Sequence, residues 1–271
     1  MRYLVTGAAG AIGSACVSKL LAAGASQVFG LDSRAFDGPH SARLMAHSSF
    51  TPVQTHHSEL SDEACLRDAL MAEASGGGPP ALSEPLDGLI CVQGGNPPGL
   101  DNTNYSAPGE TATGVFAKQF DFNLLSTVAA VNACMPQIVA GRGSIVLSSS
   151  VNGLTGIGEV PYSCAKAALH PLAMNLAVHY GPQGVNANVV AIGTVASPNI
   201  WGSALEKDPA VLEKIGSRNP RRKVGTPEEA ADVLVFLASP QAALINGAVI
   251  VADGGWTIAA GTSTDNASWF D

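Results

Sequence analysis

Residues 2–13 of the chain read RYLVTGAAGAIG. The first five residues form a short apolar strand candidate, and Gly7, Gly10 and Gly13 form a turn directly after it. Glycines at such a turn let the backbone approach a pyrophosphate, whose charge the amides and dipole of a following helix would receive. This stretch therefore predicts a strand, a phosphate-binding turn and a helix, in that order.

The next segments complete the pattern of a dinucleotide site. Ser14 to Ala23 has a helical pattern that ends at Gly24, and a second strand runs from Gln27 to Leu31. Asp32 follows that strand nineteen residues after Gly13, close to the spacing of about 20 residues expected at such a site. A plain tight turn is the alternative interpretation of the glycines.

Asp32 and Arg34 bear on the choice of cofactor. The Asp32 carboxylate would accept hydrogen bonds from the adenosine ribose hydroxyls and repel a 2′-phosphate, which favours NAD over NADP. Arg34 could pair with a 2′-phosphate, or it could be a solvated surface charge. We expect NAD as the cofactor, and NADP as the alternative.

The composition favours a globular domain whose partners are small molecules. Hydrophobic residues make up 46% of the 271 residues and charged residues 13%, which suits a sheet covered on both faces, in one domain over residues 1–271. The net charge of −8 opposes nucleic acid or anionic membrane as the main partner. No apolar run approaches the ~18 residues of a membrane span.

The cysteines and histidines carry little special chemistry. Five cysteines form no C-x-x-C pair, so we expect buried free thiols and a cytoplasmic protein; a signal peptide is the rival interpretation of the first 25 residues. His56 and His57 are adjacent, and adjacent residues on a strand point to opposite faces, which makes a poor chelating pair. We expect no metal.

Later strand candidates alternate with helical patterns. They span residues 88–92, 144–147, 185–191 and 245–253, whereas the stretch from Asp32 to Phe50 is polar and expected to be irregular. Gln93-Gly94-Gly95 and Ser148-Ser149-Ser150 follow two of these strands, at the carboxyl ends where open parallel sheets bind ligands.

Tyr162 and Lys166 are four residues apart and would share one face of a helix. A phenol with a pKa near ~10 falls short as a base at neutral pH by roughly 4 kcal/mol. An ammonium ~4 to 5 Å away contributes on the order of 3 to 4 kcal/mol towards the anion. This pair predicts a general acid/base whose pKa the lysine lowers.

Together these motifs resemble the short-chain dehydrogenase/reductase family in its compact single-domain form. The resemblance rests on the glycine turn, Asn123, the run Ser148 to Gly153, the stretch Tyr162 to Lys166 and the stretch Asn246 to Gly255. It implies a doubly wound α/β Rossmann fold with about seven parallel strands and helices on both faces. It also implies hydride transfer with nicotinamide, and a dimer or tetramer.

The resemblance implies four catalytic residues. Tyr162 is the general acid/base, and Lys166 lowers its pKa and holds the nicotinamide ribose. Ser150 orients the substrate oxygen; the commoner family spacing selects Ser149 instead, and both remain open. The backbone of Asn123 positions a water that leads to the lysine.

The resemblance also implies a set of cofactor contacts. The chain departs from the family pattern at four places. Ala11 stands where the family usually has glycine, and Gln93-Gly94-Gly95 where it has Asn-Ala-Gly. Glu59 stands in the place of an aspartate, and Ile192-Gly193 in the place of Pro-Gly. The implied contacts are Gly7, Gly10, Ala11, Ile12, Gly13, Asp32, Ser33, Glu59, Leu60, Gln93, Gly94, Gly95, Tyr162, Lys166, Gly193, Val195 and Ser197.

The expected function is NAD-dependent oxidation of a secondary alcohol or reduction of a ketone. Residues 194–224 would cover the site, and their apolar side chains favour a hydrophobic or cyclic substrate. A non-catalytic NAD(H) sensor or scaffold on the same fold is the alternative. A nucleotide-sugar epimerase is disfavoured, because no length remains for a separate sugar-nucleotide domain.

Overall fold

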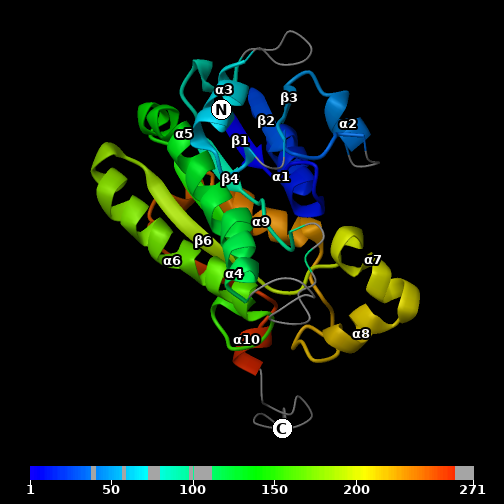
Figure 1. Cartoon of the computed structure of the whole chain (residues 1–271). Coiled ribbons are helices and arrows are strands. Elements are labelled where there is room, and N and C mark those ends of the chain that lie inside the picture. Colours follow the sequence, from blue (N-terminus) through cyan, green and yellow to red (C-terminus); the bar gives the residue numbers. More distant parts are fainter. Residues whose placement is uncertain (38–40, 57–58, 73–79, 98–99, 101–111, 260–271) are drawn as a thin grey trace.

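The computed structural model describes residues 1–37, 41–56, 59–72, 80–97, 100 and 112–259, with the backbone alone at 198–200 and 203. The strands are β1 (Arg2–Thr6), β2 (Gln27–Asp32), β3 (Phe50–Gln54), β4 (Gly88–Cys91), β5 (Ser144–Ser150), β6 (Asn186–Ile192) and β7 (Val249–Ala252). They form one parallel sheet in the order β3-β2-β1-β4-β5-β6-β7 (Figure 1). This order confirms the predicted doubly wound Rossmann fold.

Helices connect the strands. They are α1 (Ala11–Ala22), α2 (Ser41–Met45), α3 (Glu63–Met71), α4 (Ala112–Phe120), α5 (Ser126–Gly141), α6 (Val160–Tyr180), α7 (Pro198–Lys207), α8 (Val211–Gly216), α9 (Pro227–Leu237) and α10 (Trp256–Ala259). A π-helical turn, η3 (Asp121–Leu125), joins α4 to α5, and short 3₁₀ turns are η2 (Ala81–Ser83), η4 (Val151–Gly153), η5 (Gly181–Gln183) and η6 (Pro240–Ala242). The predicted covering segment contains α7 and α8.

Local sequence explains where two of these helices begin. The Asp62 side chain accepts hydrogen bonds from the amides of Ala64 and Cys65, which caps α3. At α9, Thr226 and Glu229 form a reciprocal capping box, and Pro227 occupies the first helical position. Both starts therefore follow from capping residues in the local sequence.

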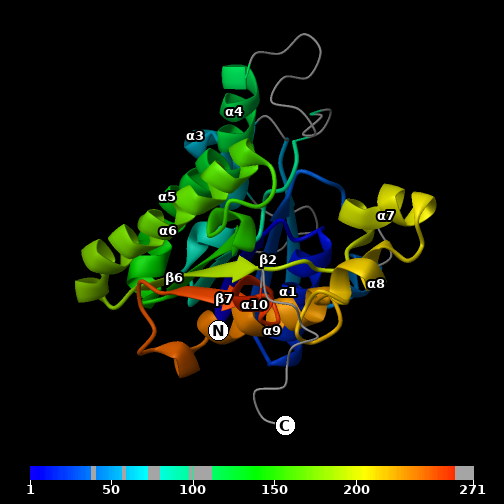
Figure 2. The same ribbon diagram turned by 90° about the horizontal axis from the view of Figure 1, so that it is seen from below.

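The sheet is buried on both faces (Figure 2). α3, α5 and α6 cover one face, and α1 and α9 cover the other. Alternate residues of β1 serve the two cores: Leu4 packs into the first, whereas Tyr3 and Val5 pack into the second. A strand with two buried faces reads as a continuous apolar run, which is why β1 was recognisable from sequence.

The element boundaries differ from the prediction at several places. Neither α2 nor β3 is predicted by the sequence pattern, which is polar from Asp32 to Phe50. Pro52 lies inside β3, where it is tolerated because β3 is the edge strand and pairs only with β2. β5 continues three residues beyond the predicted end, through Ser150, because its last residues pair with β6.

α4, η3 and α5 form one continuous helix of 30 residues, Ala112–Gly141. By length and composition alone it could cross a membrane, with a mean hydropathy of 1.4, although polar residues such as Gln119 and Asp121 interrupt it, so it contains no unbroken apolar run of ~18 residues. Half of its most apolar window is buried inside the fold, as in the core helix of a globular protein. Packing against the sheet, α3 and α6 accounts for that composition.

All five cysteines are free, as predicted. Cys16, Cys91 and Cys134 are buried and Cys65 is partly buried, but Cys164 is exposed, contrary to expectation. Burial raises the pKa of the Cys16 and Cys91 thiols to about 12, which keeps these two side chains protonated.

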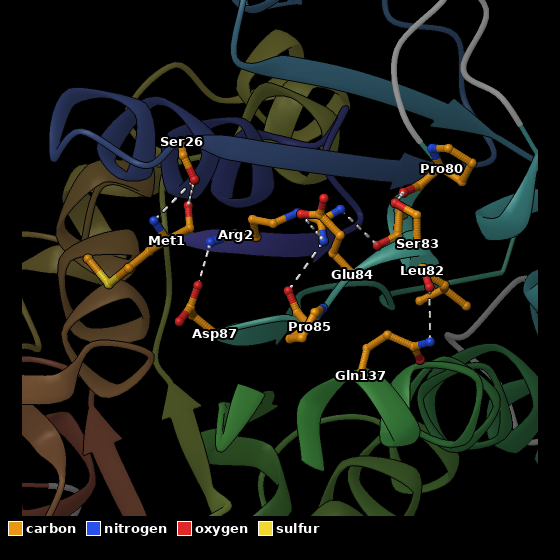
Figure 3. A network of polar contacts seen from close by, with 11 residues as sticks. Met1, Arg2, Ser26, Pro80, Leu82, Ser83, Glu84, Pro85, Asp87 and Gln137 are labelled. Atoms are coloured by element: carbon orange, nitrogen blue, oxygen red, sulfur yellow. Dashed lines mark hydrogen bonds and ion pairs between the residues drawn. The ribbon is translucent and has the colours of Figure 1, made fainter. Parts of the chain in front are cut away.

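At the amino-terminal end of the sheet, Arg2 fastens β1 to the segment before β4 (Figure 3). Its amide donates to Asp87 Oδ2 at 2.6 Å. Its guanidinium donates to the carbonyls of Ala81 and Pro85 at 3.5 and 3.4 Å and pairs with Glu84 at 3.2 Å. This network lies opposite the carboxyl ends of the strands, so it stabilises the sheet without occupying the ligand-binding edge.

Candidate active site

The sheet order brings the motifs together at one edge. Asp32 and Ser150 are the last residues of β2 and β5. The glycine turn, Gln93 and Gly193 come after the ends of β1, β4 and β6. In the sheet these strands are adjacent in the order β2-β1-β4-β5-β6. Because the strands are parallel, their carboxyl ends meet at the edge where such sheets bind ligands. Motifs up to 186 residues apart in the chain, from Gly7 to Gly193, therefore lie along one line.

The turn between β1 and α1 is shaped to receive a phosphate. Gly10 is the N-cap of α1, and no side chain caps this helix. The amides of Ala11, Ile12 and Gly13 thus lie in a first turn that supplies them no acceptor. A Cβ at Gly13 would stand 2.1 Å from the Gly7 carbonyl oxygen, so only glycine lets the helix pack this close. These residues fit the pyrophosphate of a dinucleotide.

Asp32 is buried, at 5% exposure, and holds the adjoining turn. Its carboxylate accepts from the amides of Ala9 and Arg34, both at 2.9 Å. The Arg34 guanidinium donates to both carboxylate oxygens at 3.2 Å, and a Cβ at Gly10 would lie 2.9 Å from Arg34 Nη2. Arg34 is therefore ion-paired with Asp32 beside the glycine turn, while its side chain remains 50% exposed, so it is both a surface charge and the partner of Asp32.

The loop after β4 lies against Asn123 and Lys166. Gly95 donates its amide to Asn123 Oδ1 at 2.8 Å, and its carbonyl accepts from Asn123 Nδ2 at 3.0 Å. A Cβ at Gly94 would lie 2.6 Å from Asn123 Oδ1 and 2.8 Å from Lys166 Nζ. This close approach explains glycine where the family pattern has alanine. The Thr6 hydroxyl donates to Gln93 Oε1, which fixes the start of the loop.

Asn123 lies in the π-helical turn η3, and Gln119 supports it. The fully buried Gln119 receives two hydrogen bonds from Asn123 Nδ2, one at Oε1 (2.7 Å) and one at its carbonyl (3.1 Å). The Thr127 hydroxyl donates to the Asn123 carbonyl at 3.2 Å. π-turns are frequent at functional sites. Sequence reasoning missed Gln119, although it stands one helical turn before Asn123.

The end of β5 faces α6. Lys166 Nζ donates to the Ser148 carbonyl at 2.9 Å and to the Gln93 carbonyl at 3.5 Å. Ser149 is buried, and its hydroxyl donates to the Lys166 carbonyl at 2.9 Å. The Ser150 hydroxyl is hydrogen-bonded to the Tyr162 phenol. Of the two candidate serines, the structure brings Ser150 to Tyr162 and turns Ser149 into the sheet–helix junction.

Burial controls the titration of the pair on α6. It raises the pKa of Tyr162, while the hydrogen bond from Ser150 acts in the opposite direction. It lowers the pKa of Lys166 to about 8. The expectation that Lys166 lowers the pKa of Tyr162 is therefore wrong for the protein alone, because desolvation disfavours both charged forms. The ammonium nitrogen lies 6.0 Å from the centre of the phenol ring.

The remaining cofactor candidates are held mainly by backbone contacts. The Glu59 carboxylate accepts from the Thr55 hydroxyl at 2.7 Å and the His56 amide at 3.0 Å; these bonds, that of His56 first, hold its pKa below the ordinary value. Ser33 and Leu60 are partly buried.

Residues after β6 continue this edge. The Gly193 amide donates to the Ala252 carbonyl at 3.0 Å. Val195 and Ser197 are buried, and the Val195 carbonyl accepts from Trp201 Nε1 at 3.0 Å, which ties α7 to the end of β6.

Exposed apolar side chains lie between the catalytic candidates in the chain. Leu154, Ile157 and Val160 are 43%, 48% and 39% exposed and belong to the segment that links Ser150 to Tyr162.

A cavity of about 360 Å³ lies beside β6 and β7, and its charged lining consists of Arg221, Lys223, Glu229 and Asp253. None of the four catalytic candidates lines it, but Val195, one of the expected cofactor contacts, does. Within the described residues no three His, Cys, Asp or Glu side chains gather as metal ligands would. His57, one of the two adjacent histidines, lies outside those residues.

Sheet order and glycine turn together define a doubly wound α/β protein of the dinucleotide-binding class. A family model described as Enoyl-(Acyl carrier protein) reductase matches residues 7–257. A solved oxidoreductase of the short-chain dehydrogenase/reductase family from Burkholderia thailandensis has a TM-score of 0.79 and 33% identity, covering 95% of this chain and 92% of that one. The chain belongs to the short-chain dehydrogenase/reductase family, whose members use nicotinamide cofactors.

Three relatives show the range of the family around this chain. Protein MoaE of Klebsiella aerogenes is 37% identical to this chain in a matched region that covers 56% of this chain and 62% of that protein. The inactive 2-(S)-hydroxypropyl-CoM dehydrogenase 2 of Xanthobacter autotrophicus is 32% identical over 73% of this chain and 83% of its own length. Cis-4-hydroxycyclohexanecarboxylate dehydrogenase of Sinomonas cyclohexanicum is 30% identical over 94% and 95%.

Proposed function

We propose that this chain is an NAD-dependent oxidoreductase that transfers a hydride between nicotinamide and a secondary alcohol or ketone. The observation that carries the proposal is the half-buried Tyr162 phenol, hydrogen-bonded to Ser150 and one helical turn from the buried Lys166. The glycine turn at the same edge supports a dinucleotide cofactor beside these groups.

When bound, the nicotinamide dinucleotide supplies the hydride acceptor for alcohol oxidation, or the donor for ketone reduction. In oxidation, Tyr162 takes the hydroxyl proton as the carbon loses its hydride and the C=O double bond forms. The Ser150 oxygen accepts from the Asn152 amide at 3.2 Å, and its proton, which meets the Tyr162 phenol in the protein alone, would be donated to the substrate oxygen when substrate is bound. In reduction, Tyr162 returns the proton.

Lys166 and Asn123 would carry the proton between Tyr162 and the solvent. With a pKa of about 8, the Lys166 amine can gain or lose a proton near neutral pH, and its bonds to two backbone carbonyls hold it in place. Asn123, locked to Gly95 by two hydrogen bonds, offers its backbone carbonyl for the water that the family relay requires. The closeness of Gly94 to both side chains supports this assignment.

We propose a hydrophobic or cyclic substrate. Leu154, Ile157 and Val160 present exposed apolar surface beside Ser150 and Tyr162 in the chain. Trp201, Leu205 and Val211 of the covering helices are partly buried, and none is a member of the two cores among the described residues. One relative is named for a cyclic secondary alcohol, which agrees with this class.

A non-catalytic sensor remains the second candidate, because one relative with 32% identity is named as inactive. Replacement of Tyr162 with Phe separates the two. We expect the substitution to lower kcat at least 1000-fold for a panel of cyclic secondary alcohols, because the acid/base group is lost, and to leave the NADH dissociation constant within about threefold.

Absorbance of reduced nicotinamide measures turnover, and fluorescence titration measures binding. Tyr180→Phe at the end of the same helix is the matched control and should behave as the wild type. Wild-type binding of NADH without turnover on any alcohol or ketone would favour the sensor.

Cofactor preference tests the Asp32–Arg34 pair. We propose that NAD is preferred, because Asp32 faces the turn with its charge only partly offset by Arg34. Arg34→Ala should raise the NAD to NADP ratio of kcat/KM about tenfold, because the one cation paired with Asp32 is removed. Asp32→Ala should lower this ratio below that of the wild type. An unchanged ratio in both variants would contradict the pair's role in cofactor choice.

We propose that copies of the chain associate into dimers or tetramers. β7 is the last strand of the sheet and has a neighbour on one side only. Val251, Leu244 and Ile258 near this edge are 45%, 99% and 86% exposed. An apolar, unpaired edge favours association with another chain.

Light scattering should give the mass of four chains for the wild type, and a smaller assembly for Ile258→Lys, because the added charge would be buried. Val178→Lys, on the exposed face of α6, tests whether a second apolar face contributes. A monomeric wild type would contradict association.

A further inference from the structure

Three consecutive serines at the end of β5 contact three successive turns of α6. Ser150 bonds to Tyr162, the Ser148 carbonyl accepts from Lys166, and the Ser149 hydroxyl lies 2.9 Å from His170 Nε2. Tyr162, Lys166 and His170 are spaced by four residues, so they share one face of the helix. Of these three residues His170 lies furthest along α6 from its amino-terminal end, and the proposed reaction does not use it.

The hydrogen bonds of Ser149 define which atom donates. Its single proton is directed to the Lys166 carbonyl at 2.9 Å, so its oxygen can only accept at the second contact. His170 Nε2 must then carry a hydrogen and donate it to Ser149. Burial lowers the pKa of His170, which favours the neutral ring at neutral pH, and the contact with Ser149 assigns the proton of that ring to Nε2.

This arrangement ties the strand and the helix together at a buried point. Ser149 is 3% exposed, and it joins the backbone of Lys166 to the ring one turn further on. Ser150 is the next residue of the strand, so a shift of Ser149 moves the hydroxyl that meets Tyr162. In such sites a displacement of about 1 Å can cost up to 100-fold in rate.

We propose that His170 is a positioning residue: through Ser149 it fixes α6 against β5 and so sets the distance between the Ser150 hydroxyl and the Tyr162 phenol. The inference rests on the proposed function, since it concerns the alignment of that reaction's acid/base pair. His170 itself contacts neither Tyr162 nor Ser150 by any hydrogen bond among the described residues.

Four single variants test the proposal by steady-state kinetics with NAD and an alcohol substrate. His170→Leu removes the ring donor, His170→Gln keeps an N–H donor, and Ser149→Ala removes the acceptor. The control is His179→Leu, the same substitution at an exposed position of the same helix. A double variant, Ser149→Ala with His170→Leu, tests whether the two side chains act as one unit.

We expect His170→Leu and Ser149→Ala each to lower kcat about tenfold, with the KM for NAD within about twofold. The double variant should be no worse than either single variant, because each removes the same link. His170→Gln should recover to within about threefold of the wild type. His179→Leu should match the wild type.

Three results would overturn the proposal: a wild-type kcat in His170→Leu, an increase in KM without loss of kcat, or a His170→Gln variant as impaired as His170→Leu. The last would mean that the ring acts by packing alone.

A second measurement does not depend on catalysis. Nitrogen-15 NMR of the histidine rings at neutral pH should show His170 with its proton on Nε2, and this signal should change in Ser149→Ala. A ring protonated on Nδ1 alone would overturn the pairing. If the wild type turns over no substrate, the proposed function fails, while the tautomer still decides whether the pair exists.

Discussion

The Lys166 ammonium lies where little water reaches it, at 3% exposure, between the ends of β4 and β5 and the body of α6. A buried cation is costly unless it is hydrogen-bonded, and here two backbone carbonyls accept from it. One carbonyl belongs to Ser148, inside β5, and the other to Gln93, in the loop after β4, so the lysine links these two segments. The site is consequently built around a side chain that lowers stability when charged, which is typical of a functional rather than a structural residue.

Several close approaches around this lysine follow from the same constraint. Gly94 leaves the room that a Cβ would take from Lys166 and Asn123, and the π-turn η3 carries Asn123 into contact with the loop after β4. Gln119 then satisfies the amide of Asn123 from one turn earlier. Each of these contacts gives a buried polar group a hydrogen-bond partner. The same contacts hold the proposed catalytic side chains in position.

Much of this arrangement could be predicted from the sequence. The parallel sheet followed from alternating patterns, and the motifs at strand ends could be assigned to one edge because parallel strands share their direction. The contact of His170 with Ser149 could not be predicted, since it depends on how β5 and α6 pack. The contact of Arg34 with Asp32, two residues away, could not be predicted either, because it depends on the conformation of the loop after β2. β3 was missed because Pro52 and the polar stretch before it hide an edge strand.

The pKa values of Tyr162 and Lys166 show most clearly what the sequence alone could not predict. Spacing alone indicates that Lys166 stands near Tyr162, and a charge nearby should lower the pKa of a phenol. Burial depends on the whole fold, and in the folded protein it is the largest cause of both shifts, raising the pKa of Tyr162 and lowering that of Lys166. The contact that favours the phenolate in the folded protein is the hydrogen bond from Ser150.

The central claim is that Lys166 is held buried against β4 and β5 and titrates near neutral pH. NMR titration of the ε-amino groups in lysine-labelled protein tests it directly, with Lys166→Met to assign the signal. The account predicts a resonance with a pKa of about 8 that disappears in the variant. A Lys166 signal with the ordinary pKa of a lysine, about 10.4, would contradict the account.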